Sequence, residues 1–253
     1  MKSAHCKSSG FTLLELSCSL AIGLIILLSS AALIGAAANG YAHVRSGMET
    51  NRECRSFTRM LAADLATAQF HNDTRIERSS AKWPAAHLGF LSLQLPKAQS
   101  ENGQIGDLCA VHYYLKDVQV CGNTMRCLLR GFHDSKDTFQ ALKDGRVSEL
   151  FSKQTVKEEI VAFGVVSFDV TPKSRDENGV WAGCRKGQQI APQAIQVRLV
   201  IARQNIIARL KGSADWDGTS ADGLLLGKPL EVGHNKNLQV YETLMRFGND
   251  SHP

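Results

Sequence analysis

A long apolar run near the amino terminus constrains this chain more than any other feature. From Leu16 to Ala38 the sequence contains neither a charged residue nor a proline. A helix rises about 1.5 Å per residue, and about 20 apolar residues cross the hydrocarbon core of a membrane. The run is therefore long enough to span a bilayer as a single helix.

One acid, Glu15, lies at the start of this run. An unpaired carboxylate in hydrocarbon costs on the order of 3 kcal/mol even on lenient insertion scales, so its position predicts a partner of opposite charge. The leader, residues 1–10, carries Lys2 and Lys7 and no acid. By the positive-inside rule they stay on the cytoplasmic side, and everything after Ala38 is expected in the periplasm.

The segment Gly10-Phe11-Thr12-Leu13-Leu14-Glu15-Leu16, with its basic leader and apolar run, resembles the prepilin family, which comprises type IV pilins and the pseudopilins of type II secretion systems. The resemblance implies that a prepilin peptidase cuts after Gly10 and that Phe11, the new first residue, is N-methylated. It also implies that Glu15 pairs with the terminal amine of a neighbouring subunit. Such a pair is strong in low dielectric when both charges are desolvated together.

Two simpler interpretations explain less. A secretory signal peptide has an apolar core of about 7–15 residues and a small-residue cleavage site. Ala36-Ala37-Ala38 could serve as that site, but the run is too long and Glu15 is misplaced. A plain signal anchor tolerates the length and gives no reason for Gly10 and Phe11 before the acid.

Beyond Ala38 the apolar residues recur mostly at three- or four-residue spacing, which predicts that the helix continues to about Phe70. Its expected apolar stripe is Val44, Met48, Phe57, Leu61, Leu65 and Ala68, and its expected solvated face is Arg52, Glu53, Arg55, Arg59 and Asp64. The predicted organisation is a leader at 1–10, a transmembrane and assembly helix at 11–38, a helix continuation packed on the head at 39–70, and a periplasmic β-rich head at 71–253.

The remainder of the chain reads as short strands separated by loops. Strands are expected at 88–95, 108–115, 126–132, 160–171 and 194–203, with 126–132 returning in a hairpin and 238–247 forming a strand or a short helix. One long helix followed by many strands predicts an α+β fold in which the helix packs on a mostly antiparallel, pilin-like sheet. Hydrophobic residues at 43% fit a folded protein, and the mild net charge of +5 gives no reason to expect a nucleic-acid partner.

Pieces of this second half carry a narrower resemblance. Residues 164–170, 179–181 and 192–199, together with 61–68 and 128–130, are similar to the head of J-type minor pseudopilins and W-type minor pilins. The resemblance implies a subunit of the inner membrane that assembles with other minor and major pilins or pseudopilins near the tip of a type II secretion pseudopilus or type IV pilus. Residues 218–238 and 249–253 have no counterpart in it.

The cysteines beyond the apolar run are expected to face an oxidising compartment, where disulfides persist. Cys121 and Cys127 flank a turn-like stretch and form a possible disulfide, with Cys109 as a rival partner. The others are Cys54 and Cys184. Because five is an odd number, at least one thiol is free or pairs between chains. No C-x-x-C or Cys/His zinc spacing is present.

Patterns that would indicate catalysis or cofactor binding are incomplete. No Gly-x-Ser-x-Gly elbow accompanies His112 or His133, and Gly223–Lys228 lacks the spacing of a phosphate loop. Asp215, Asp217 and Asp222 have the oxygen density of a calcium loop without its ligand spacing or terminal glutamate, which favours a solvent turn. The sequence predicts neither an enzyme nor a cofactor. The alternative is a membrane-anchored periplasmic enzyme or a calcium-dependent binding module.

Overall fold

The structure, a computed structural model, divides into two compact units, residues 1–47 and 48–253, which we describe separately. For Ala42 and His43 only the backbone is described. The described residues are 12–70, 73–77, 82–120, 122–152, 157–176, 179–183, 192–229, 233 and 235–247.

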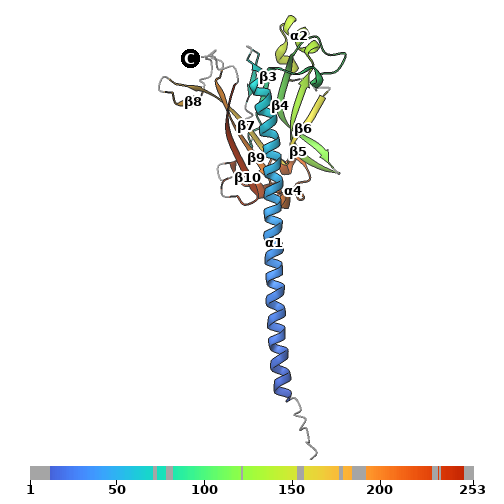
Figure 1. Cartoon of the computed structure of the whole chain (residues 1–253), viewed down its shortest axis with the longest axis vertical. Helices are drawn as coiled ribbons and strands as arrows, with labels where there is room; N and C mark the ends of the chain where they lie inside the picture. The colour runs from blue at the N-terminus through green and yellow to red at the C-terminus, as the bar shows by residue number, and fades with distance from the viewer. Residues whose placement is uncertain are drawn as a thin grey trace, which may run out of the picture. The chain divides into compact units, whose positions relative to one another are not determined.

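The described part of the first unit is entirely helical after Thr12. It belongs to α1, a continuous α-helix from Leu13 to Ala66 (Figure 1). The exposed leucines and isoleucines between Leu13 and Ile34 have exposed fractions from 52% at Leu24 to 88% at Leu13. Within the described residues, α1 is the one helix that is long and apolar enough to cross a membrane. Such a surface is suited to lipid or to other helices rather than to water.

The second unit contains two antiparallel sheets, which confirms the predicted α+β, pilin-like fold. The first sheet has the order β1-β3-β4-β5-β6 with β2 also on β3, and the second has the order β10-β9-β7-β8. The strands are β1 (Ala68–Gln69), β2 (Arg75–Glu77), β3 (His87–Leu93), β4 (Leu108–Val120), β5 (Asn123–His133), β6 (Lys157–Phe163), β7 (Val165–Arg175), β8 (Trp181–Gly183), β9 (Ala194–Ala202) and β10 (Leu238–Arg246).

Short helices join the strands of this head. They are α2 (Ser135–Lys143), α3 (Val147–Leu150), α4 (Gln204–Ile207) and α5 (Ser213–Trp216), with 3-10 turns η1 (Pro96–Ala98) and η2 (Gly223–Leu226). The strands expected near 88–95, 108–115, 126–132 and 194–203 are confirmed as β3, β4, β5 and β9, and 238–247 forms a strand, β10. The predicted hairpin is the β4–β5 pair.

The helix ends earlier than the expected Phe70. After Ala66 the chain turns at Thr67, and Ala68 pairs with Ser92 of β3 as part of strand β1. The carbonyl of Thr67 accepts a hydrogen bond from the backbone N–H of Leu93 at 3.1 Å. The backbone groups at this edge of β3 pair with residues 67–69, and they would lack these partners if the helix continued for another turn.

The single strand expected at 160–171 is two strands in different sheets. β6 ends at Phe163 and β7 begins at Val165, and Gly164 between them has a φ of +67°. That backbone conformation is open to glycine at little cost and unfavourable for other residues. Gly164 thus lets an apolar stretch pass from one sheet to the other.

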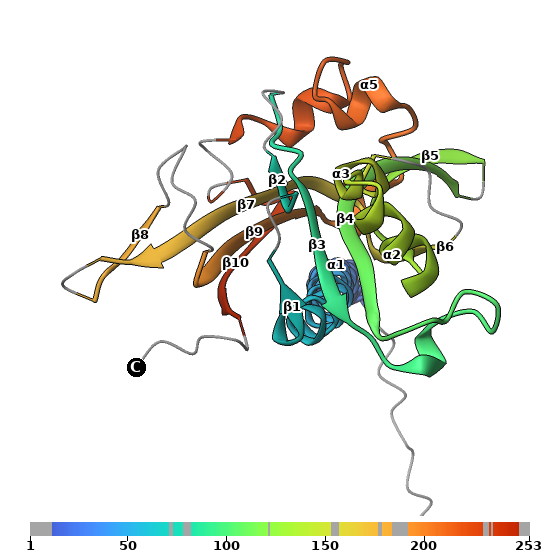
Figure 2. The ribbon, with the colours of Figure 1, turned by 90° about the horizontal axis from the view of Figure 1, so that it is seen from above.

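The head half of α1 packs between the two sheets. Seen from above, β3 and β4 lie to one side of α1, and β7, β9 and β10 lie to the other (Figure 2). The ring of Phe57 meets Tyr113 of β4 edge-on at 6.2 Å and Phe168 of β7 at 6.0 Å. Leu61 and Leu65 are fully buried in the same core. One face of α1 therefore fills the space between both sheets.

The buried stripe starts later along α1 than expected. Val44 is 61% exposed and Met48 is 68% exposed, whereas Thr50 and Cys54 are buried. The prediction that Val44 and Met48 belong to the buried stripe is wrong, because the core of the head begins to enclose α1 only at Thr50 and Cys54.

Asp64 belongs to this buried face rather than to the solvated face expected for it. It is 4% exposed, and it lies three residues after Leu61 and seven after Phe57 in α1, so it projects in the same direction as these two residues. Its two carboxylate oxygens accept four hydrogen bonds, from Arg130 Nε at 2.7 Å, Arg130 Nη2 at 2.9 Å, Tyr113 Oη at 2.6 Å and Gln94 Nε2 at 2.9 Å. A buried charge is tolerated when it is paired and hydrogen-bonded in this way.

We expect Asp64→Ala to lower the free energy of unfolding by about 3–5 kcal/mol, because it leaves the guanidinium of Arg130 buried without its carboxylate. Denaturant unfolding of the full chain in detergent, followed by the fluorescence of buried Trp216, measures the change. Asp217→Ala removes a carboxylate that is 54% exposed and paired with Arg126, and should cost less than about 1 kcal/mol. Equal losses in the two variants would refute the anchoring role of Asp64.

Candidate functional site

Glu15 forms a reciprocal cap at the first turn of α1. The backbone N–H and the hydroxyl of Thr12 both donate to Glu15 Oε2 at 3.3 Å, and the backbone N–H of Glu15 donates to Thr12 Oγ1 at 3.3 Å. This is a capping box, in which two otherwise unsatisfied donors of a helix start are paired. The negative charge also lies where the helix dipole favours it.

The sequence already contains the signal for this cap. Thr12-Leu13-Leu14-Glu15 has the Thr-x-x-Glu spacing of a capping box before an apolar run, a signal separate from the charge pair expected for Glu15. The cap engages Oε2 alone, and the second oxygen, Oε1, accepts no hydrogen bond from any described residue. One oxygen can therefore hold the helix start while the other remains available to a cation.

The hydroxyl groups within the apolar run are satisfied inside the helix. Ser17 and Ser19 each donate to the carbonyl three residues earlier, Leu14 and Leu16, at 2.9 Å. Ser29 and Ser30 each donate to the carbonyl four residues earlier at 2.8 Å. Hydrocarbon offers no hydrogen-bond partner, so polar groups in a spanning helix need internal ones.

The comparison with protein families bears on this segment. Residues 6–31 match the family model of the prokaryotic N-terminal methylation motif. This match supports the resemblance of the chain to the type IV prepilin and pseudopilin family. The match includes Gly10, Phe11 and Glu15; the first two lie outside the described residues, and the roles of all three remain predictions. A search of curated proteins found no match.

The acidic stretch of the head does not assemble a calcium loop. Asp217 pairs with Arg126 at 2.8 Å and Asp222 with Arg209 at 2.8 Å. Asp215 accepts the backbone N–H groups of Lys211 and Gly212 at the start of α5 and the hydroxyl of Ser220. Within the described part of the chain, no three His, Cys, Asp or Glu residues are grouped to hold a metal ion.

This stretch is also not the solvent turn favoured by the sequence. Trp216, between the two acids, is fully buried and donates its indole N–H to the carbonyl of Thr124 at 2.9 Å. Asp117 joins Asp217 on the guanidinium of Arg126. Asp217 therefore fastens the end of α5 to β5 through Arg126, whereas Asp222 pairs with Arg209 and Asp215 bonds within its own turn.

Three histidines from three neighbouring strands of the head gather beneath α3. His87 Nε2 lies 3.1 Å from His112 Nδ1, which also lies 3.1 Å from the carbonyl oxygen of Phe151. His133 Nε2 lies 2.9 Å from the carbonyl oxygen of Leu150. Because a carbonyl only accepts, the hydrogens are on His112 Nδ1 and His133 Nε2. The histidines thus hold the end of α3 on the sheet.

The backbone of β3 makes room for this contact. A Cβ atom at Gly89, which pairs with His112 in the register, would lie 2.6 Å from the ring of Phe151. No catalytic elbow accompanies His112 or His133 in the sequence, and no local pattern marks His87, because the three rings come together only through pairing across strands.

The cysteines of the described head are buried thiols. Burial raises the pKa of Cys54 and Cys109 to about 12 and that of Cys127 to about 11, so their thiolates are suppressed at neutral pH. Cys127 lies in β5 opposite Lys116. Cys121 and Cys184 lie outside the described residues, and the pairing of Cys121 with Cys127 stays a prediction.

We expect the head to lose stability as the pH falls from about 6.5 to about 4. Burial lowers the pKa of His87 and of His112 to about 4, whereas an unfolded histidine titrates near 6.5. In this window the unfolded chain binds more protons than the folded one, so the free energy of unfolding decreases with falling pH. His112 alone should contribute on the order of 2 kcal/mol.

Denaturant unfolding of the full chain at a series of pH values measures this slope. The matched variant His87→Phe with His112→Phe removes both titrations and should flatten the slope between pH 6.5 and 4. An unchanged slope in that variant would show that other groups cause the acid sensitivity.

Proposed function

We propose that this prepilin is a non-enzymatic filament subunit, processed by a prepilin peptidase at Gly10 and anchored in the inner membrane before assembly. The methylation-motif match at residues 6–31 carries the proposal. The exposed apolar surface of α1 supports it, since a surface of this kind can leave lipid only by packing against equally apolar helices. The family is one of structural subunits, in keeping with a role outside catalysis.

The physical mechanism that we propose is helix bundling with charge neutralisation. Cleavage exposes the amine of Phe11, and the Glu15 carboxylate of one subunit pairs with the amine of another. The capping box supports this role, because it fixes the carboxylate at the helix start through Oε2 and leaves Oε1 without a described partner. In low dielectric the pair is worth far more than in water.

We further propose that the subunit is a minor one, placed near the tip of a type II secretion pseudopilus or a type IV pilus, with other minor and major subunits as partners. The resemblance of residues 164–170, 179–181 and 192–199 to J-type and W-type heads supports this placement. These segments contribute buried core residues of β7 and β9, such as Phe168, Ile195 and Leu199.

Co-expression with a prepilin peptidase should shorten the chain by ten residues and leave an N-methylated Phe11 at its start. Intact-mass spectrometry and sequencing of the terminal peptide measure both changes. Gly10→Val should block the cut while leaving membrane insertion intact. A wild-type product that still begins at Met1, or one cut near Ala38, would refute the proposed processing.

The charge of Glu15 and its cap can be separated by two variants. Glu15→Gln keeps a side chain that can cap but removes the charge, and should strongly reduce filament incorporation while sparing insertion. Thr12→Ala removes the two hydrogen bonds of the hydroxyl and keeps both the backbone N–H donor and the charge of Glu15; its helix start should lose about 1 kcal/mol and assembly should persist. Fractionation of membrane and sheared filaments measures the two outcomes. Normal incorporation of Glu15→Gln would exclude the charge pair.

A further inference from the structure

Three arginines form a row on the head half of α1. Arg52, Arg55 and Arg59 are exposed, and none forms an ion pair with a carboxylate among the described residues. At about 100° per residue, their spacing of three and four places all three within one 60° sector of the helix. Like charges at this spacing repel one another, so an anionic partner would lower the electrostatic energy of the row.

The same face continues as a strip of small side chains. Ala62, Ala63 and Ala66 follow Arg59 on the same side of the helix, within about 20° of that sector, and are exposed. Small residues let the backbone of a second helix approach closely. The arginines provide charge and the alanines provide close contact, so the combined face from Arg52 to Ala66, here called the arginine–alanine face, suits a helix.

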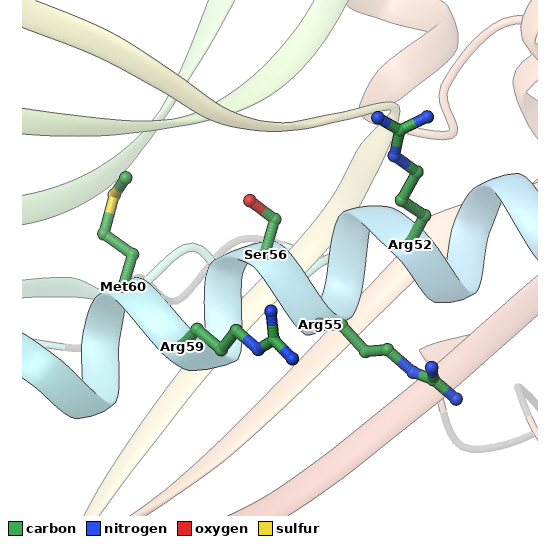
Figure 3. Close-up of a pocket in the computed structure, with 5 residues that line it drawn as sticks. All are labelled: Arg52, Arg55, Ser56, Arg59 and Met60. Atoms are coloured by element: carbon green, nitrogen blue, oxygen red, sulfur yellow. The ribbon is translucent and has the colours of Figure 1, made fainter.

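Grooves of the head flank the arginines. One of about 640 Å³ is lined by Arg52, Arg55, Ser56, Arg59 and Met60. Figure 3 shows Arg55 and Arg59 extending side by side from successive turns, with Ser56 and Met60 along the other edge. A second groove of about 540 Å³ includes the same Arg55 and Arg59 together with Asn51 and Tyr241. Guanidinium groups shared by two grooves can reach carboxylates that enter from either side.

The acids of α1 beyond Gly47 are poorly placed to serve a second copy of this face. Asp64 is buried and committed to Arg130. Glu53 is half-buried, and burial raises its pKa in spite of nearby Arg52. Glu49 is exposed and already has an interaction in the structure. Two copies packed through this face would therefore set arginine against arginine.

We propose that the arginine–alanine face docks an acidic helix of a different subunit, with carboxylates spaced three and four residues apart opposite Arg52, Arg55 and Arg59. The inference rests on the proposed function and adds the chemistry of the partner to it. Charge complementarity makes the contact selective, because a helix that carries arginine or lysine on the matching face is repelled. A subunit with this face joins a mixed assembly rather than a homopolymer built on this contact.

The test uses the full chain in detergent and a synthetic amphipathic helical peptide as probe. The peptide carries glutamates at the matching spacing followed by alanines, and a second peptide has glutamine in place of each glutamate. By fluorescence anisotropy at low salt, the glutamate peptide should bind about tenfold or more tightly than the glutamine peptide, with the difference shrinking as salt rises. Arg52→Glu with Arg55→Glu and Arg59→Glu should abolish the difference.

A matched variant changes the net charge equally at another place. Lys97→Glu with Lys136→Glu and Lys143→Glu reverses three exposed lysines of the head and should leave peptide binding within about twofold. The inference is overturned if both variants lose binding alike, if neither peptide binds, or if the arginine variant changes self-association instead. It is also overturned if a short DNA duplex binds the face in preference to the peptide.

Processing by the prepilin peptidase is measured on the same variants. A chain that is cut at Gly10 yet fails to bind the acidic peptide would refute the docking face and leave the proposed function standing. A chain that binds the peptide but is never processed would refute the proposed processing and leave the docking face standing.

Discussion

The carboxylate of Glu15, at the start of a helix that is long and apolar enough to cross a membrane, is the constraint on which the proposed assembly depends. The serines of the run satisfy their hydroxyls on backbone carbonyls of the same helix, so they add little to the cost of immersion in hydrocarbon. Glu15 is only partly satisfied in this way, since its cap uses one oxygen. A charge that the helix itself leaves unneutralised favours assembly with another chain.

In the head, a second carboxylate on α1 is neutralised by residues of the same chain. Asp64 is another acid on α1, and the sheet supplies Arg130, Tyr113 and Gln94 to fill both of its oxygens. This cluster fixes the angular position of the helix, which turns Phe57, Leu61 and Leu65 into the core. The arginine–alanine face is then left on the outside. A buried acid that is paired internally thus determines which residues of α1 remain for a partner.

Local patterns predicted the parts of this fold that local physics controls. Apolar alternation identified β3, β4, β5 and β9, and the length and composition of the apolar run indicated a spanning helix. The errors have separable causes. The charge of Asp64 predicts exposure, whereas its spacing of three and seven residues from Leu61 and Phe57 indicates burial. Gly164 lies within one apolar stretch, yet glycine permits a change of sheet.

Other features depend on tertiary pairing and had no local signal. The histidine cluster forms because β3, β4 and β5 are neighbours in a particular register, which no single stretch encodes.

The carbodiimide reaction of assembled filaments tests the central claim most directly, using a lipid-soluble reagent that joins a carboxylate to an adjacent amine. We predict an amide bond between Glu15 of this chain and the amino-terminal residue of another subunit, identified by mass spectrometry after mixing isotope-labelled and unlabelled subunits. Reagent adducts on Glu15 without any cross-link between subunits would contradict the account.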